Sequence, residues 1–175
     1  LTDTNGERSI TVIGERLAPT YKDNLDWNIF EKMDGIFITA SDSEIFKKAR
    51  IAESLCTTPR VGLSTINKSN VFLDGLIGSN LDPGEVFSLS EISIKPKLII
   101  KTEGENGGIV HPGGRYKALV NKKHKVDSYG CGDSFAAGIL YGLSSKWSID
   151  KSLNLAKVLG RDASNFFGPY KKNDN

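Results

Sequence analysis

The residue types that most directly indicate chemistry lie in a short segment with three small residues between two carboxylates. It runs from Asp127 to Asp133, contains Gly130, Cys131 and Gly132, and is followed by an Ala- and Gly-rich run of helical character. Small residues let the backbone turn sharply, so that successive N–H groups point into one concavity at the start of a helix. The helix N-terminus adds roughly half a positive charge, which suits a phosphate group. Asp133 stands where a carboxylate can take a proton from an attacking hydroxyl.

The same segment also has a purely structural interpretation. Gly130 and Gly132 can form the turn from a strand to a helix, and Asp133 can cap that helix. Short glycine motifs often arise by chance, so the segment alone leaves both interpretations open.

A second glycine-containing segment directly follows the clearest apolar strand of the sequence, residues 97–101. It has the pattern T-x-G-x-x-G, with Thr102, Gly104 and Gly107 at the specified positions. Ligands of open α/β sheets gather at the carboxyl ends of strands, and glycines there let the phosphates of a nucleotide approach the backbone closely. A plain hairpin is the alternative interpretation of these residues.

The composition describes one globular domain of ordinary size. The chain has 175 residues, of which 38% are hydrophobic, with a formal net charge of +2 and a mean hydropathy of −0.28. The balanced charge gives no indication of a nucleic-acid partner, and no apolar run approaches the ~20 residues of a membrane span. Because no secretory signal pattern is visible, we expect a cytoplasmic protein that binds neither nucleic acid nor membrane. Cys56 and Cys131 are the only cysteines, and their wide separation predicts free thiols.

Apolar periodicity and turn residues predict an initial hairpin and then an alternation of strands and helices, which is typical of a layered α/β sheet. The hairpin covers residues 1–16 around an Asn-Gly turn. Predicted strands are 35–39, 60–64 and 97–101, with an antiparallel return over 108–110 and 116–120. Predicted helices are a short one near 27–33, a longer one capped by Ser41 that includes Leu55, a short one at 70–76, and two C-terminal helices at 134–143 and 148–167.

Together, the two glycine segments resemble those of a known family. A strand ending in T-x-G-x-x-G, then a hairpin, then D-[ST]-x-G-x-G-D at the start of an Ala/Gly-rich helix is similar to the C-terminal half of the PfkB family of carbohydrate and nucleoside kinases. The resemblance implies the ribokinase-like fold, a layered α/β/α sheet with a small β lid. Residues 1–16 would then be part of the β lid, and residues 17–175 the α/β nucleotide-binding core. Family members are much longer at the N-terminus, so we expect the part that carries many sugar-contacting residues to be missing here.

The resemblance implies a role for each residue of the first segment. Asp133 would be the catalytic base that deprotonates the acceptor hydroxyl, and the backbone N–H groups of Gly130, Cys131 and Gly132 would form an anion hole. Family members often have Ala or Gly where this chain has Cys131, and a role played by the backbone tolerates the thiol. Asp127 matches a carboxylate that in several members helps to hold a monovalent cation.

The resemblance also implies where ATP binds. Thr102, Gly104 and Gly107 would line the phosphates and ribose, and Lys157 in the last helix would border the base.

The family usually holds Mg²⁺ and its waters with an N-x-x-E pair, and this chain departs from that pattern. Here Asn80 is followed by Glu85 five residues later. Either the loop carries an insertion and Asn80 with Glu85 still reach the metal, or Asp82 takes the place of the acid. A plain Asp-Pro-Gly turn is the third interpretation. Phosphoryl transfer from ATP generally uses a metal to neutralise the phosphates, so we expect a magnesium requirement.

We therefore expect an ATP-dependent kinase that phosphorylates a hydroxyl of a small sugar or nucleoside, with a homodimer through the lid as one arrangement. Two alternatives remain. One is a catalytically silent regulator of the same fold that binds a sugar or nucleotide. The other is a dinucleotide-binding oxidoreductase, whose G-x-G-x-x-G followed by an acid about twenty residues later is not found in this sequence.

Overall fold

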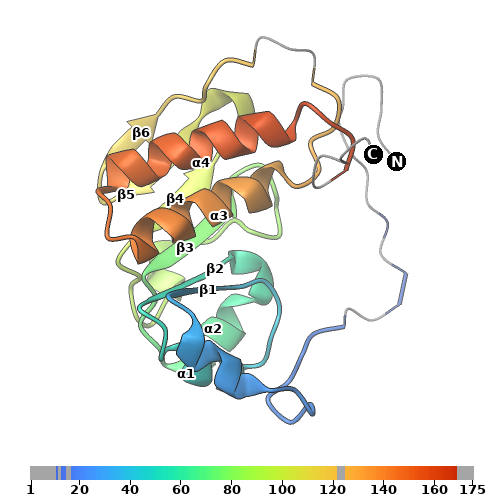
Figure 1. The fold of residues 1–175 in the computed structure, drawn as a ribbon, viewed down its shortest axis with the longest axis vertical. Coiled ribbons are helices and arrows are strands. Elements are labelled where there is room, and N and C mark those ends of the chain that lie inside the picture. Colours follow the sequence, from blue (N-terminus) through green and yellow to red (C-terminus); the bar gives the residue numbers. More distant parts are fainter. Residues whose placement is uncertain (1–10, 12, 15–16, 122–124, 169–175) are drawn as a thin grey trace.

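A sheet of six strands, which lie side by side in chain order, forms the centre of the structure (Figure 1). The computed structural model describes residues 11, 13–14, 17–121 and 125–168. Strands β1 to β4 are parallel, whereas β4, β5 and β6 pair antiparallel. The strands are β1 Gly35–Ile38, β2 Ser54–Thr57, β3 Gly75–Ser79, β4 Ile99–Thr102, β5 Gly108–His111 and β6 Gly114–Tyr116.

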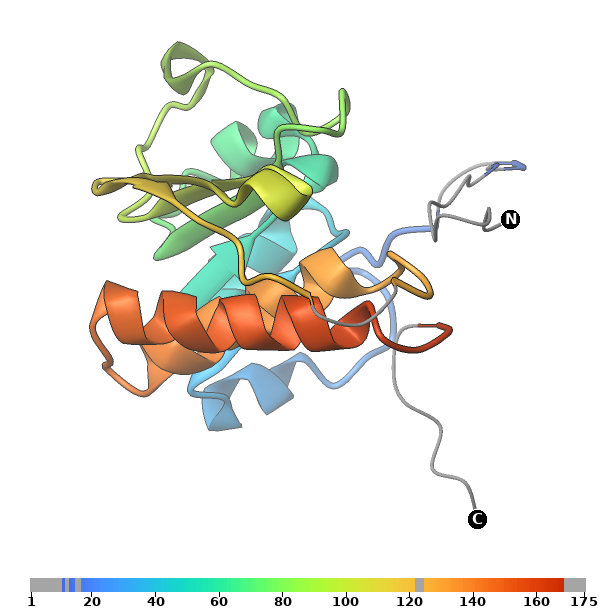
Figure 2. The ribbon, with the colours of Figure 1, turned by 90° about the horizontal axis from the view of Figure 1, so that it is seen from above.

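Helices cover both faces of this sheet. Helices α1 and α2 pack on one face, and α3 and α4 lie side by side on the other (Figure 2). Along the described ranges, no helix is long and apolar enough to cross a membrane. The α-helices are α1 Ser43–Ala49, α2 Leu63–Ser69, α3 Cys131–Ser144 and α4 Ile149–Ala163, and the 3₁₀ helices are η1 Trp27–Lys32, η2 Pro59–Val61, η3 Leu89–Glu91 and η4 Gly104–Asn106.

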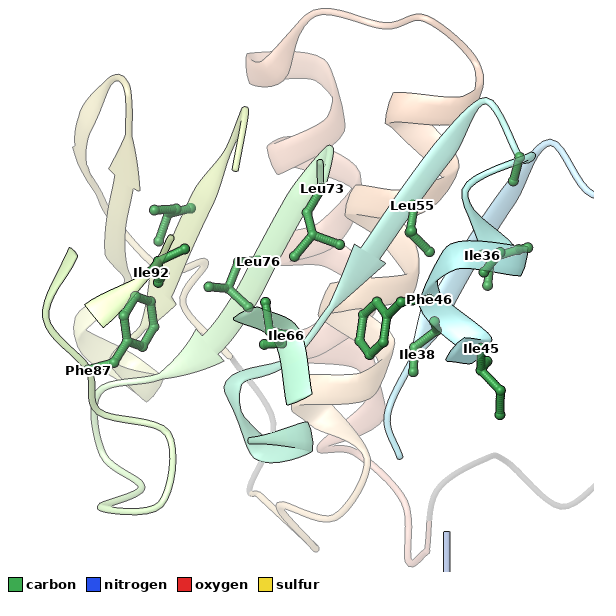
Figure 3. Close-up of a cluster of buried hydrophobic side chains, with 13 residues drawn as sticks. Ile36, Ile38, Ile45, Phe46, Leu55, Ile66, Leu73, Leu76, Phe87 and Ile92 are labelled. Atoms are coloured by element: carbon green, nitrogen blue, oxygen red, sulfur yellow. The ribbon is translucent and has the colours of Figure 1, made fainter. Parts of the chain in front are cut away.

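Successive side chains of the parallel strands enter two separate hydrophobic cores. Leu76 of β3 lies in the core under α1 and α2 (Figure 3), whereas its neighbour Ile77 lies in the core under α3 and α4. In β4, Ile99 lies in the core under α1 and α2, and Ile100 lies in the core under α3 and α4. Alternate side chains of a strand point to opposite faces, so strands that are buried on both faces read as continuous apolar runs. The predicted layered α/β sheet is confirmed.

Small residues let α3 and α4 approach each other closely. A Cβ atom on Gly138 would lie only 2.6 Å from the Cα atom of Ala156, and one on Gly142 would overlap the side chain of Ser152. Helix packing therefore accounts for the Ala- and Gly-rich composition of α3.

Helix α3 runs opposite to the parallel strands. Gly35, the first residue of β1, lies so close to the end of α3 that a Cβ atom there would overlap the hydroxyl of Ser144 and lie 3.0 Å from Leu140. Because the end of α3 lies beside the start of a strand, the start of α3 lies toward the carboxyl ends of β1 to β4.

The predicted helix from Ser41 through Leu55 is wrong in its cap and its length. Asp42 caps α1, since its Oδ1 atom accepts the N–H groups of Glu44 and Ile45 at 3.1 and 3.0 Å. Leu55 belongs instead to β2, whose four residues are all buried. Leu55 stands three residues after Ala52 and six after Ala49, so a buried residue of the next strand continues the apolar spacing of the preceding helix by chance.

Two further predictions in this region are also wrong. Residues 60–64 lie in η2 and the start of α2, because Pro59 opens a turn of 3₁₀ helix. Residues 70–76 contain the end of α2, where Asn70 has a left-handed φ of 53°, and the start of β3. Asparagine at the end of a helix commonly takes this conformation. The predicted hairpin over 1–16 lies almost entirely outside the described residues and stays a prediction.

Most of the remaining elements agree with the sequence patterns. Strands β1, β4 and β5 and helices η1, α3 and α4 lie in the predicted regions, with ends that differ by a few residues. Strand β6 ends at Tyr116 rather than at residue 120, because a two-residue turn at Pro112 and Gly113 places Gly114 opposite Val110.

We expect Gly138→Ala to destabilise the protein by about 1–3 kcal/mol, because the new methyl group overlaps the backbone of Ala156. Urea unfolding followed by circular dichroism measures the change. Gly132→Ala is the matched control in the same helix, since no described atom lies within 4 Å of a Cβ atom there and alanine favours a helix over glycine. Equal stability of Gly138→Ala and the wild type would contradict the close contact of α3 with α4.

Candidate functional site

The two glycine motifs lie at the same edge of the sheet. Strands β3 and β4 end in register at Ser79 and Thr102, and α3 begins toward this edge. The ring of Tyr116 in β6 stacks on the ring of Phe135 in α3, with centroids 6.0 Å apart. This stack holds the β5–β6 hairpin, which follows the T-x-G-x-x-G segment, against the first turns of α3. Ligands of α/β sheets bind at such an edge.

A tight turn precedes α3 and sets its first residue. Gly130 is the N-cap with a left-handed φ of 81°, a conformation that favours glycine. Its carbonyl oxygen accepts the N–H of Ser134 at 2.8 Å. The N–H of Cys131 donates to the carbonyl oxygen of Ser128 at 3.3 Å, so one amide of the predicted anion hole also closes the turn.

Gly132 and Asp133 occupy open positions in the first turn of α3. Both residues are exposed, and no described atom lies within 4 Å of a Cβ atom built on Gly132. The first N–H groups of an α-helix have no partner within the helix, and this end of the helix carries a partial positive charge. The arrangement can hold an anion next to an accessible carboxylate.

Asp127 lies in a different environment, because it is 0% exposed. Its Oδ1 atom accepts the N–H of Tyr129 at 3.0 Å, and its Oδ2 atom accepts the N–H of Gly168 at 3.1 Å. The carboxylate therefore ties the turn before α3 to the turn after α4. Its predicted role beside a monovalent cation stays a prediction.

The glycines of the T-x-G-x-x-G segment differ in their surroundings. Gly104 is exposed with a φ of 58°, whereas Gly107 is buried with a φ of 86°. A Cβ atom on Gly107 would overlap the carbonyl oxygen of Tyr116, so the hairpin itself requires glycine there. The hydroxyl of Thr102 donates to the carbonyl oxygen of Gly78 at 3.4 Å. Of these residues, Gly104 presents the accessible backbone.

Lys157, which the resemblance places at the base of the nucleotide, is half-buried on α4. It lies about one turn before Gly160, where the missing side chain makes room for the start of α3. A Cβ atom on Gly160 would lie 3.2 Å from the carbonyl oxygen of Cys131. Lys157 therefore lies on the helix that packs against the Gly130–Gly132 turn.

An arginine that sequence analysis did not single out binds the loop after β3. The Nε atom of Arg60 donates to Oε1 of Glu85 at 2.9 Å, and its Nη2 atom forms an ion pair with Asp82. Oε2 of Glu85 accepts the N–H of Ser79 at 2.7 Å. Partial burial opposes the charge of Arg60, but the hydrogen bonds and negative charges of the two acids outweigh it and raise the pKa of Arg60. Both acidic side chains of the loop are thus bound to one guanidinium group.

Asn80 belongs to a second polar group at the same edge. Its Nδ2 atom donates to Oε1 of Glu103 at 2.9 Å, and Oε2 of Glu103 pairs with Arg115. These hydrogen bonds, with the charge of Arg115, lower the pKa of Glu103. Glu103 stands at an unspecified position of T-x-G-x-x-G, and no local pattern signals its partners.

The donor chemistry of this edge fits a hard divalent cation. Asp82, Glu85 and Asn80 offer carboxylate and amide oxygens, which are the ligand atoms that Mg²⁺ prefers. Within the part of the chain that the structure describes, no group of three or more His, Cys, Asp or Glu side chains forms a ready-made metal site. Asn80 and Glu85 remain the predicted metal residues, and Glu85 is already bound to Arg60.

Part of the chain is similar in sequence to known proteins. The family model "pfkB family carbohydrate kinase" matches residues 84–162, a range that includes Glu85, Thr102, Asp133 and Lys157. Over 59 residues the chain is 32% identical to the 5-dehydro-2-deoxygluconokinase of Geobacillus kaustophilus (strain HTA426). The aligned stretch covers 33% of this chain and 18% of that protein.

Several solved kinase structures have a similar fold. The adenosine kinase from Sinorhizobium meliloti has a TM-score of 0.64 at 18% identity, and the match covers 85% of this chain and 54% of that one. The ribokinase from Thermotoga maritima has a TM-score of 0.64 at 14% identity, and the match covers 83% of this chain and 55% of that one. The nucleoside kinase from Burkholderia thailandensis, in complex with inosine, has a TM-score of 0.63 at 20% identity, and the match covers 78% of this chain and 50% of that one. The chain spans about half the length of these proteins.

The fold is therefore ribokinase-like, as the sequence predicts. The family match over residues 84–162 and the fold together confirm the resemblance to the PfkB family.

We expect Asp127→Asn to destabilise the protein by about 1–3 kcal/mol, because an asparagine has one side-chain acceptor oxygen for the two backbone N–H groups that the buried carboxylate now binds. Thermal and urea unfolding measure the loss. Asp133→Asn is the control, since this side chain is exposed and only its interaction with the helix N-terminus changes, by less than about 1 kcal/mol. Equal effects of the two substitutions would contradict the anchoring role of Asp127.

Proposed function

We propose that this chain supplies the nucleotide-binding core and the catalytic base of an ATP-dependent kinase that phosphorylates a hydroxyl of a small sugar or nucleoside. The observation that carries the proposal is the exposed carboxylate of Asp133 in the first turn of α3, directly after the left-handed turn at Gly130. Phosphoryl transfer needs a positioned nucleophile and stabilisation of the phosphate charge, and this helix start provides groups suited to both.

In the proposed reaction, Asp133 removes the proton from the acceptor hydroxyl as the hydroxyl oxygen attacks the γ-phosphorus of ATP. The bond from that phosphorus to the bridging β,γ-oxygen breaks, and ADP leaves with its electron pair. The N–H groups of Gly130, Cys131 and Gly132, with the partial charge of the helix, stabilise the negative charge of the transferring group. The exposure of Asp133 supports this role, because the acceptor can reach the carboxylate. A lid that includes residues 1–16 would close over the acceptor and exclude water.

The nucleotide, in this proposal, lies along the T-x-G-x-x-G segment. The exposed left-handed backbone of Gly104 supports a close approach of phosphate oxygens, because no Cβ atom stands in the way. Thr102 and Gly107 complete the phosphate and ribose side, and Lys157 borders the base.

Mg²⁺ that arrives with ATP would neutralise the phosphate charge. Asn80 and Glu85 are the residues that we propose to lie next to it, and Asp127 is the proposed neighbour of a monovalent cation. The oxygen donors of Asn80 and Glu85 at the end of β3 support the first assignment.

The names of the similar proteins support a small hydroxyl-bearing acceptor. They include a 5-dehydro-2-deoxygluconokinase, a ribokinase, an adenosine kinase and a nucleoside kinase in complex with inosine. Both sugars and nucleosides are therefore within the proposed acceptor class. A cytoplasmic location and a homodimer through the lid also belong to the proposal.

We expect Asp133→Asn to bind ATP nearly as tightly as the wild type but to lose turnover by roughly two or more orders of magnitude, the scale of a lost general base. An amide cannot accept the proton of the acceptor hydroxyl. ADP release over a panel of sugars and nucleosides measures turnover, and calorimetric titration measures nucleotide affinity.

Asp150→Asn is the matched control, because Asp150 is an exposed aspartate in the first turn of the neighbouring helix α4. It should retain wild-type turnover. Near-normal turnover of Asp133→Asn would remove Asp133 from the proposed role. If the wild type releases no ADP with any acceptor of the panel, the catalytically silent alternative is favoured.

A further inference from the structure

The ion pairs of Arg60 join the carboxyl ends of two neighbouring parallel strands. Arg60 lies in η2, directly after β2, and its partners Asp82 and Glu85 lie in the loop after β3. The side chain of Glu85 is only 11% exposed, and both its oxygens have protein donors, Nε of Arg60 at 2.9 Å and the N–H of Ser79 at 2.7 Å. The loop is thus held by a positive charge that belongs to the protein itself.

The backbone beneath Arg60 is fixed, whereas its guanidinium group is accessible. A Cβ atom on Gly78 of β3 would lie 2.7 Å from Cδ of Pro59, so η2 packs directly on the strand. The side chain of Arg60 is 50% exposed and that of Asp82 is 34% exposed. The guanidinium can therefore move off the two acids into solvent without any change in the position of η2.

We propose that Arg60 competes with a divalent cation for the carboxylates of Asp82 and Glu85, so that the ion-paired loop is a metal-free state that the cation must open. This inference rests on the proposed function, because it concerns the metal next to the nucleotide. A guanidinium that hydrogen-bonds a carboxylate takes up lone-pair positions that Mg²⁺ would otherwise use, and its positive charge repels a cation on the same carboxylate. Arginine stays protonated in proteins, so the competition does not depend on its ionisation.

With competition of this kind, the apparent Kd of the cation equals its intrinsic Kd divided by the fraction of molecules in which Arg60 does not bind Glu85. If Arg60 binds the loop in about nine tenths of the molecules, removal of its charge raises the apparent affinity about tenfold. The nearby pair of Arg115 with Glu103 does not include either acid of the loop. Arg115 therefore provides a control for a general change in charge at this edge.

The test measures binding of Mn²⁺ to the nucleotide-free protein by the loss of its free electron paramagnetic resonance signal. We expect Arg60→Gln to bind Mn²⁺ about tenfold more tightly than the wild type, whereas Arg115→Gln binds it as the wild type does. The double variant Arg60→Gln with Glu85→Gln should lose the gain, because it removes the carboxylate that was freed. Arg60→Lys keeps the positive charge but lacks the planar fork of the guanidinium, so its affinity for Mn²⁺ should lie between those of the wild type and Arg60→Gln. This variant provides the test if Arg60→Gln does not fold.

Unchanged or weaker Mn²⁺ binding by Arg60→Gln, with the fold verified by circular dichroism, would overturn the proposal. An equal gain in Arg115→Gln, or a gain that survives the loss of Glu85, would overturn it too. The result is independent of turnover. A gain in Mn²⁺ affinity in a protein that phosphorylates none of the tested acceptors would keep the competition and refute the kinase proposal.

Discussion

The parallel pairing of β1 to β4, with a helical layer on each face, is the constraint on which the rest of the structure depends. A parallel strand must be followed by a crossover that returns the chain to the starting edge, so the loops after all four strands meet at the opposite edge. Gly35 at the start of β1 contacts the end of α3, so this helix runs antiparallel to the strands and its N-terminus points to the same edge. The loop after β3, the T-x-G-x-x-G segment and the Gly130 turn converge because of strand direction, although they are far apart in the sequence.

The two acids of the Asp127–Asp133 segment differ in their surroundings, because Asp127 is buried and Asp133 is exposed. Burial of a carboxylate is costly unless donors replace the lost water, and Asp127 receives the N–H groups of Tyr129 and Gly168. Those bonds fix the turn before α3 and the end of α4 relative to each other. Asp133 lies in the first helical turn and remains exposed, so its carboxylate stays accessible to a ligand. The buried anchor and the accessible carboxylate are thus two acids six positions apart in one motif.

The sequence predicted the long elements and the local motifs well, and the short connections poorly, for physical reasons. Helices α3 and α4 repeat their apolar pattern over several turns, whereas β2 has only four residues, of which Leu55 happens to continue the apolar spacing of the preceding helix. The exposure of Asp133 follows from its place in the first helical turn. The contact of Arg60 with Glu85 spans 25 residues and exists only because β2 and β3 are neighbours, which no local pattern reveals. The glycine pattern also did not reveal that the hairpin requires Gly107 for its own packing.

The loop after β3 shows how a changed spacing can leave a side chain in place. Glu85 stands five positions after Asn80, whereas the acid of the family pattern N-x-x-E stands three positions after the Asn. The N–H of Glu85 donates to the carbonyl oxygen of Asp82 at 2.9 Å, and the turn brings Oε2 of Glu85 back to the N–H of Ser79 at the end of β3. Glu85 thus lies beside the residue that precedes Asn80, which supports an inserted loop over a replacement of the acid by Asp82. A carboxylate that is so little exposed needs a counter-charge, and Arg60 supplies it, so a cation that takes its place satisfies the same electrostatic requirement.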